Sequence, residues 1–306
     1  MASVSDTPDL LAPKPEVRGA GRRVGITRAR SLLGTVPFFA YVAIFLIIPT
    51  LVVVIGAFTG DDGFTLANIT ALGDDYILDA FGRSILLSAS TALLGAVIGA
   101  LLAYALTTAK PGGLLRRVVT AMSGVLAQFG GVTLAFAFVA TIGLSGFVTV
   151  FLRDNAGVDL YANGVWLFEL PGLVLVYTYF QIPLMVIVFL PALDGIRPQW
   201  REAAESLGGT TWQYWTRVAG PLLAPAFLGS TLLLFANAFS AYATAAALVS
   251  QGSPIVPLQI RGALTSEVVL GQANLGKAMA LGMVVVVAIV MALYALLQRR
   301  TAKWLG

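Results

Sequence analysis

Long apolar runs separated by short polar connections cover almost the whole chain after residue 32. Six runs reach the roughly 20 residues that a helix needs to cross a bilayer. They extend over Leu33–Phe58, Phe81–Thr108, Val118–Ile142, Trp166–Leu193, Pro221–Val249 and Lys277–Leu297. Lipid cannot satisfy backbone polar groups, and runs this continuous lack the alternation of barrel strands. The pattern predicts an all-α integral membrane protein with six transmembrane helices.

The apolar pattern does not determine where the third run ends. Residues Gly143–Leu152 are apolar enough either to extend this run or to form a short separate helix near the outer surface. The apolar pattern favours neither arrangement over the other.

Composition supports a single membrane domain. Only 11% of the 306 residues are charged and 58% are hydrophobic, whereas soluble domains have about 25% charged residues. We assign residues 33–298 to this domain. Residues 1–32 are polar, Arg-rich and without apolar periodicity, which predicts a disordered basic tail, and residues 299–306 form a short C-terminal tail.

The Lys and Arg residues predict the orientation. Of nineteen, only Arg83, Arg153, Arg261 and Lys277 fall on the side that would be external if the N-terminus is internal. The positive-inside rule therefore places both termini in the cytoplasm of a bacterial cell. Because topology explains the basic charge, the net +4 does not indicate nucleic-acid binding.

Candidate chemistry is scarce. The chain has no Cys and no His, which removes thiol nucleophiles, imidazole bases and the usual metal-ligand sets. We therefore predict no catalytic site, no metal and no cofactor. The nearest approach to an enzyme site is the acidic cluster Asp74, Asp75 and Asp79, which is more typical of a solvated outer loop.

Small residues and prolines shape two of the predicted spans. Gly95, Gly99 and Ala103 lie on one face of the second span, so a neighbouring helix can approach closely there. Pro183 and Pro191 in the fourth span remove backbone donors and favour a kink.

Neutral polar groups occur within the spans, whereas their central parts hold no charged residue. The candidates for lining a passage are Gln128, Thr133, Gln181, Asn237, Ser240, Tyr242 and Thr244. Each is equally compatible with a hydrogen bond between helices. The lack of buried carboxylates disfavours an ion-coupled carrier.

The connection Asp194–Gly220 between the fourth and fifth spans has a helical pattern of its own. Pro198 suits a first helical turn, and Trp200, Ala203, Ala204 and Leu207 recur at helical spacing. Gly208 then suits a helix end. The pattern fits either an interfacial helix with its tryptophans among lipid headgroups or a docking helix for a partner.

This connection carries a family resemblance. Glu202-Ala203-Ala204, then Gly208, then Val218-Ala219-Gly220-Pro221 resembles the Glu-Ala-Ala loop of permease subunits in binding-protein-dependent ATP-binding cassette (ABC) importers. Val218 and Gly220 replace the Ile and Leu of the family pattern, but the spacing from Glu202 to Pro221 is kept. Phe64-Thr65-Leu66-Ala67-Asn68 after the first span is most similar to the spermidine/putrescine permease group.

The resemblance implies a type I importer permease in the bacterial inner membrane. Its coupling helix would comprise Glu202, Ala203, Ala204, Leu207 and Gly208 and would bind a cytoplasmic ATPase dimer. The further partners implied are a second, related permease, an external solute-binding protein and membrane lipid. The expected solute is a polyamine-like cation, with ferric iron, thiamine or aminoethylphosphonate as alternatives. The rival is a stand-alone carrier or channel.

Overall fold

The structure is a computed structural model that describes residues 35–60, 63–110, 112–249, 255–265 and 272–302. The predicted N-terminal tail lies outside the described residues. The chain divides into two compact units, Met1–Val52 and Val53–Gly306. The helices and strands are η1 (Ala43–Ile47), α2 (Ile48–Ala57), β1 (Thr59–Gly60), β2 (Gly63–Phe64), α3 (Ala67–Thr70), η2 (Ala71–Gly73), α4 (Asp75–Thr108), α5 (Leu114–Gln128), α6 (Gly131–Ile142), α7 (Phe147–Ala156), η3 (Trp166–Phe168), α8 (Leu170–Asp194), α9 (Pro198–Ser206), α10 (Thr211–Tyr214), η4 (Trp215–Ala219), α11 (Gly220–Ser240), α12 (Ala243–Leu248), α13 (Val256–Thr265) and α14 (Gln272–Ala302).

Six helical segments among the described residues are long and apolar enough to span a membrane. They are Thr35–Ala57, Asp75–Thr108, Gly131–Ala156, Leu170–Asp194, Thr211–Ser240 and Ala273–Leu296. Five of them overlap the predicted spans closely. The predicted fold class, all-α with six spans, is confirmed.

The third predicted span is wrong in its extent. A single helix over Val118–Ile142 was expected, but α5 ends at Gln128 and α6 begins at Gly131, which has φ +75°. That backbone region is open to glycine and costly for other residues. The amide of Gly131 donates to the Thr244 hydroxyl at 2.9 Å, which satisfies a group that the break frees. Thr244 therefore joins α6 to α12.

The stretch Gly143–Leu152 belongs to the third membrane segment, Gly131–Ala156, but it does not continue α6. A turn at Gly143–Gly146 separates α6 from α7, so a distinct helix begins at Phe147. Tyr161 secures the loop that follows, because its hydroxyl donates to the Ile142 carbonyl at 2.5 Å. Burial of this hydroxyl raises the pKa of Tyr161 above its usual value.

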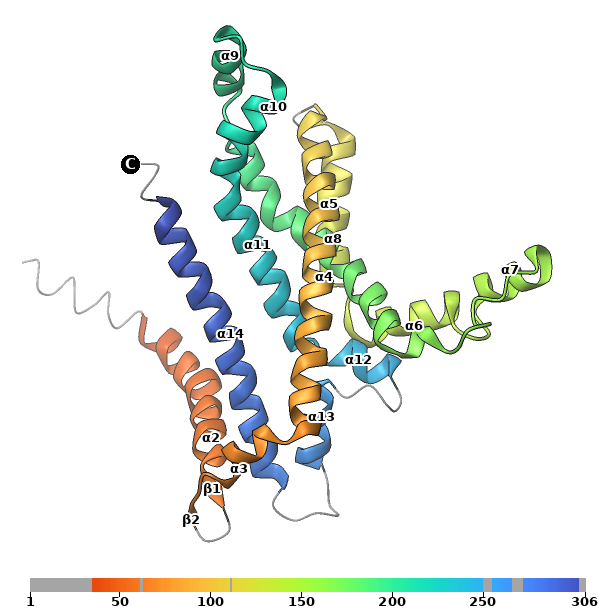
Figure 1. The fold of residues 1–306 in the computed structure, drawn as a ribbon, viewed down its shortest axis with the longest axis vertical. Helices are drawn as coiled ribbons and strands as arrows, with labels where there is room; N and C mark the ends of the chain where they lie inside the picture. The colour runs from red at the N-terminus through yellow and green to blue at the C-terminus, as the bar shows by residue number, and fades with distance from the viewer. Residues whose placement is uncertain (1–34, 61–62, 111, 250–254, 266–271, 303–306) are drawn as a thin grey trace, which may run out of the picture. The chain divides into compact units, whose positions relative to one another are not determined.

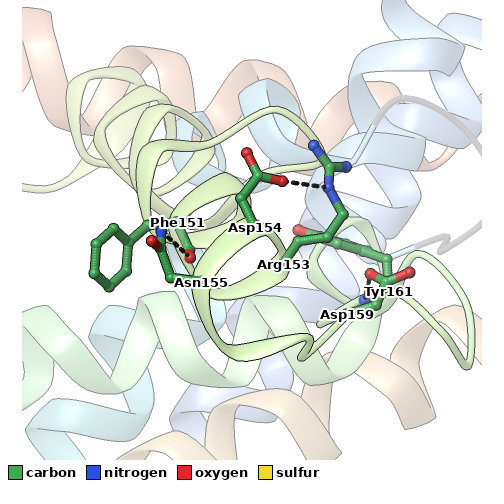
Figure 2. A network of polar contacts seen from close by, with 6 residues as sticks. All are labelled: Phe151, Arg153, Asp154, Asn155, Asp159 and Tyr161. Carbon is green, nitrogen blue, oxygen red and sulfur yellow. Dashed lines mark hydrogen bonds and ion pairs between the residues drawn. The ribbon is translucent and has the colours of Figure 1, made fainter.

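Short-range polar contacts hold the end of α7 and the loop after it (Figure 2). Arg153 pairs with Asp154 at 3.5 Å, and the side-chain amide of Asn155 donates to the Phe151 carbonyl at 2.9 Å. In the loop, the Tyr161 amide donates to the Asp159 carboxylate at 2.9 Å. All three contacts join residues close in sequence, so they order this segment without tying it to the other helices.

Helix α8 is the central element of Val53–Gly306, since it packs against α4, α5 and α11. It stays helical through Pro183 and Pro191. Its buried face includes Tyr177 and Met185, both 0% exposed. Two apolar clusters share α4, α8 and α11, one on each side of Gln181 along the helix.

The predicted small-residue face of α4 is confirmed as the contact with α8. A methyl group on Gly95 would lie 2.5 Å from Cβ of Gln181, and one on Gly99 would lie 2.5 Å from Cβ of Met185. Ala103 on the same face is fully buried. The glycines therefore set how closely these two helices approach.

Replacing Gly99 with valine is expected to destabilise the fold by about 1–3 kcal/mol, because the added atoms must push α4 and α8 apart. Gly82 is the matched control, since it lies on the same helix with nothing within 4 Å of an added methyl group. Thermal unfolding of the detergent-solubilised chain measures the difference. Equal losses for Gly99→Val and Gly82→Val would show that the close contact is not what matters.

Both π-helical turns occur just before a proline. In an α-helix the ring of Pro49 would collide with the Phe45 carbonyl, and that of Pro221 with the Arg217 carbonyl. Phe45 lies in η1 and Arg217 in η4. We infer that the wider turns relieve these collisions, so the chain enters α2 and α11 without breaking.

Candidate functional site

The connection between α8 and α11 folds as the sequence predicts. α9 spans Pro198–Ser206, with Pro198 in its first turn. Figure 1 shows α9 and α10 at one end of the helices of Val53–Gly306, while α12 and α13 lie at the other end. The predicted Glu-Ala-Ala segment is therefore presented on a short helix at an end of the bundle.

Glycine ends α9 through paired backbone hydrogen bonds. Gly208 has φ +76°, and its amide donates to the Glu205 carbonyl at 2.9 Å. The Gly209 amide reaches back to the Ala204 carbonyl, also at 2.9 Å. Together these are the two bonds of a Schellman motif, which needs a residue in the left-handed region. The predicted helix stop at Gly208 is confirmed.

The apolar stripe of α9 is not covered by the rest of the described chain. No residue of α9 is buried. Leu207 at its end is 89% exposed, Trp200 is 36% exposed and Ala203 is exposed. An exposed apolar stripe on an otherwise polar helix is typical of a surface that binds something.

The acidic residues of α9 differ in their pairing. Glu205 forms an ion pair with Arg201 one turn earlier, at 2.9 Å. Glu202 is exposed and has no ion-pair partner among the described residues. Its carboxylate is therefore available to a group outside this chain.

The second half of the connection is anchored to the helices. A capping box starts α10, in which the Gln213 amide donates to the Thr210 hydroxyl at 3.3 Å and the Gln213 side chain accepts from the Thr210 amide at 2.9 Å. Trp215 then packs edge-on against Tyr104 of α4, with ring centroids 5.2 Å apart. Trp212, three residues earlier, is 76% exposed. Trp212 and Trp215 therefore lie in different surroundings.

An ion pair between Arg116 and Asp194 links the start of α5 to the end of α8. Asp194 is the last residue of α8 and the first of the connection, and both side chains are partly exposed. Pairs of this kind add little stability. The Arg116–Asp194 pair holds the start of α5 beside the end of α8, where the connection begins. The sequence pattern does not identify this contact.

The seven candidate lining residues differ in burial, and Gln181 and Thr244 are the two that are buried. Gln181 is fully buried, and its side-chain amide donates to the Leu234 carbonyl of α11 at 2.7 Å. It therefore forms the helix-to-helix bond that the sequence left as the alternative. Exposed positions are occupied by Gln128, Thr133, Asn237 and Ser240, and Tyr242 is half-buried.

Two of these residues line one groove. Ser240, the last residue of α11, and Tyr242, just before α12, face a cavity of about 500 Å³. The other residues that line it are Pro257, Ile260, Arg261, Leu264 and Thr265 of α13 and Met283 of α14. The guanidinium of Arg261 lies over the Tyr242 ring, 5.8 Å from its centroid. Sequence reasoning assigned Arg261 only to the outer surface, because nothing in its neighbourhood marks it as facing α11.

The fold is that of the type I ABC importer permeases. The solved permease of a bacterial ABC transporter that imports the acidic polysaccharide alginate has a TM-score of 0.73, with 19% identity, over 90% of this chain and 97% of that one. No family model matches the sequence.

Curated relatives are permease proteins of ABC import systems. A putative ferric transport permease, FbpB 1 of Haemophilus influenzae, is 28% identical over 198 residues, which are 62% of this chain and 30% of that protein. CysT, a sulfate transport permease of Escherichia coli, is 28% identical over 54% of this chain and 57% of its own length. CysW, the sulfate permease of Synechococcus elongatus, is 25% identical over 94% of this chain and 97% of its own. The chain thus spans less than two thirds of the first two relatives.

Proposed function

We propose that this chain is a transmembrane permease subunit of an ATP-driven importer and that α9 couples it to a cytoplasmic ATPase. The observation that carries the proposal is the exposed, amphipathic α9 with its unpaired Glu202, on a fold shared with ABC importer permeases. Relatives named for ferric and sulfate transport support the same reading.

Coupling in this proposal is mechanical. The coupling segment Glu202, Ala203, Ala204, Leu207 and Gly208 lies in a cleft of the ATPase, where Leu207 is buried and Glu202 meets a cation. Movement of the ATPase pair displaces α9. The displacement reaches α4 through Trp215 and Tyr104, and α5 through Asp194 and Arg116.

The assembly and its setting belong to the same proposal. The chain pairs with a second, related permease, two ATPase subunits and an external solute-binding protein, in a bacterial inner membrane with both termini cytoplasmic. ATP is hydrolysed by the partner and not by this chain. Candidate lining residues are the exposed Gln128, Thr133, Asn237 and Ser240, together with Tyr242.

The solute is the least determined part. The acidic residues of the predicted outer loops, and the resemblance after the first span, favour a polyamine-like cation. The relatives are named for ferric iron and sulfate. The groove beside Arg261 bears on this choice.

Purification of the tagged chain from its native membrane tests the importer function. We expect an ATPase subunit and a second permease to co-purify in mild detergent, and the complex to hydrolyse ATP. Proteoliposomes with this chain alone should transport nothing. A chain that purifies without an ATPase and transports by itself would support the stand-alone carrier instead.

A further inference from the structure

The groove between α11 and α13 combines one positive charge with neutral polar groups. Arg261 and Thr265 come from α13, one turn apart, Ser240 is the last residue of α11, and Tyr242 lies just before α12. The remaining walls are apolar, formed by Pro257, Ile260, Leu264 and Met283. Its volume of about 500 Å³ lies within the range of small-molecule sites.

We propose that this groove attracts and holds small anionic solutes, oxyanions in particular, through Arg261. The inference rests on the importer function proposed above and names the class of its solute. The proposed solute is an anion, whereas the resemblance after the first span favours a polyamine-like cation.

The charge of Arg261 is not neutralised within the described chain. Its side chain is exposed to the groove, and none of the ion pairs among the described residues includes it. No lining residue of the groove is acidic. A guanidinium carries a fixed charge and a planar set of donors that matches the geometry of oxyanions. Among the described residues, the one charge that lines the groove is therefore positive.

The same geometry disfavours a cation. A cationic solute is bound by carboxylates or by the faces of aromatic rings. Among the lining residues the only aromatic ring is that of Tyr242, and the Arg261 guanidinium already lies over it at 5.8 Å. A polyamine entering this groove would meet a like charge, and none of the described residues that line the groove is an acid to offset it.

Neutral polar groups continue from the groove along α11. Asn237 lies three residues before Ser240, so both are on one face of the helix, and both are exposed. The Ser240 hydroxyl donates to the Ala236 carbonyl at 2.9 Å and can turn toward a ligand. An anion that leaves Arg261 would next meet uncharged groups, which hold it weakly enough to pass.

Charged thiol reagents test the proposal directly, because the natural chain has no cysteine. Single cysteines are placed at Thr265, on α13, and at Ser240, across the groove. Each variant in right-side-out membrane vesicles is labelled with a methanethiosulfonate that carries a sulfonate and with one that carries a trimethylammonium. The measured quantity is the ratio of the two labelling rates.

We expect the sulfonate reagent to be favoured at both positions. Arg261→Gln should lower the sulfonate-to-ammonium ratio by about tenfold, the size expected for loss of a unit charge a few ångströms away in a partly solvated groove. Arg261→Lys should keep most of the preference, since it keeps the charge. A cysteine at Val158, in the loop after α7, is the control whose ratio should not respond to either Arg261 variant.

Three results would overturn the proposal. They are an unchanged ratio in Arg261→Gln, faster labelling by the ammonium reagent while Arg261 is present, and absence of labelling at both groove positions in vesicles where Val158→Cys is labelled. Labelling requires no ATPase. Failure here is therefore distinguishable from failure of the importer function, which co-purification and transport measure.

Discussion

Glu202→Lys is expected to weaken ATPase binding by more than about tenfold while leaving membrane insertion and thermal stability unchanged. The Glu202 carboxylate is exposed and has no ion-pair partner among the described residues, so its removal breaks no ion pair of that part of the chain. In a partner's groove, a reversed charge is desolvated beside a like charge, which costs about 2 kcal/mol or more. Co-purification of the ATPase and solute-stimulated ATP hydrolysis measure the effect.

Glu205→Lys is the matched control for this prediction. It makes the same charge change one turn further along α9, at a residue whose partner is Arg201 of the same helix. We expect it to remove an exposed i,i+4 pair that contributes little to stability, and to reduce ATPase binding far less. Equal losses for both variants would mean that the overall charge of α9 matters and that Glu202 has no special contact.

The second large effect is expected for Gly208→Val. Valine at φ +76° is strained by at least about 1–2 kcal/mol, so the Schellman motif that ends α9 should be lost. The direction of the chain from α9 into α10 then changes, and Leu207 moves out of place. We expect ATPase co-purification and stimulated hydrolysis to fall together, with only a small drop in the thermal-unfolding midpoint of the chain because no residue of α9 is buried.

Asparagine at the same position provides the control. Asn adopts the left-handed region more readily than other non-glycine residues, so Gly208→Asn should retain most ATPase binding. A Cβ added at Gly208 meets no atom within 4 Å. Backbone conformation is therefore the difference between the two variants. Similar losses with Val and Asn would show that the partner's cleft has no room for any side chain there.

The helices and the coupling segment could be predicted because local pattern determines them. Long apolar runs must be helical in lipid whatever their neighbours, and Pro198 and Gly208 mark the ends of α9 through their own backbone preferences. The prediction of the third span was wrong because it, too, used only the local apolar pattern. Its apolar run continues through Phe129–Gly130, where hydrophobicity carries no sign that a glycine at φ +75° will interrupt the helix.

Pairings between distant residues lay beyond the sequence. Gln181 and Ser240 are both neutral polar residues in apolar runs, yet one is fully buried against Leu234 and the other faces a groove. Nothing in their flanking residues separates them. The contacts of Trp215 with Tyr104 and of Arg261 with Tyr242 likewise join separate helices.

The sequence by itself determined that this chain is a helical membrane protein with an amphipathic segment between its fourth and fifth apolar runs. Periodicity and backbone preference depend on residues close together in the chain, so they can be recognised from the sequence alone. Only the tertiary structure decided which polar groups are buried, which face a groove, and that Arg261 lies opposite Ser240 and Tyr242. Those outcomes depend on how helices far apart in sequence pack together, and the hydrophobic pattern of each helix leaves that packing undetermined.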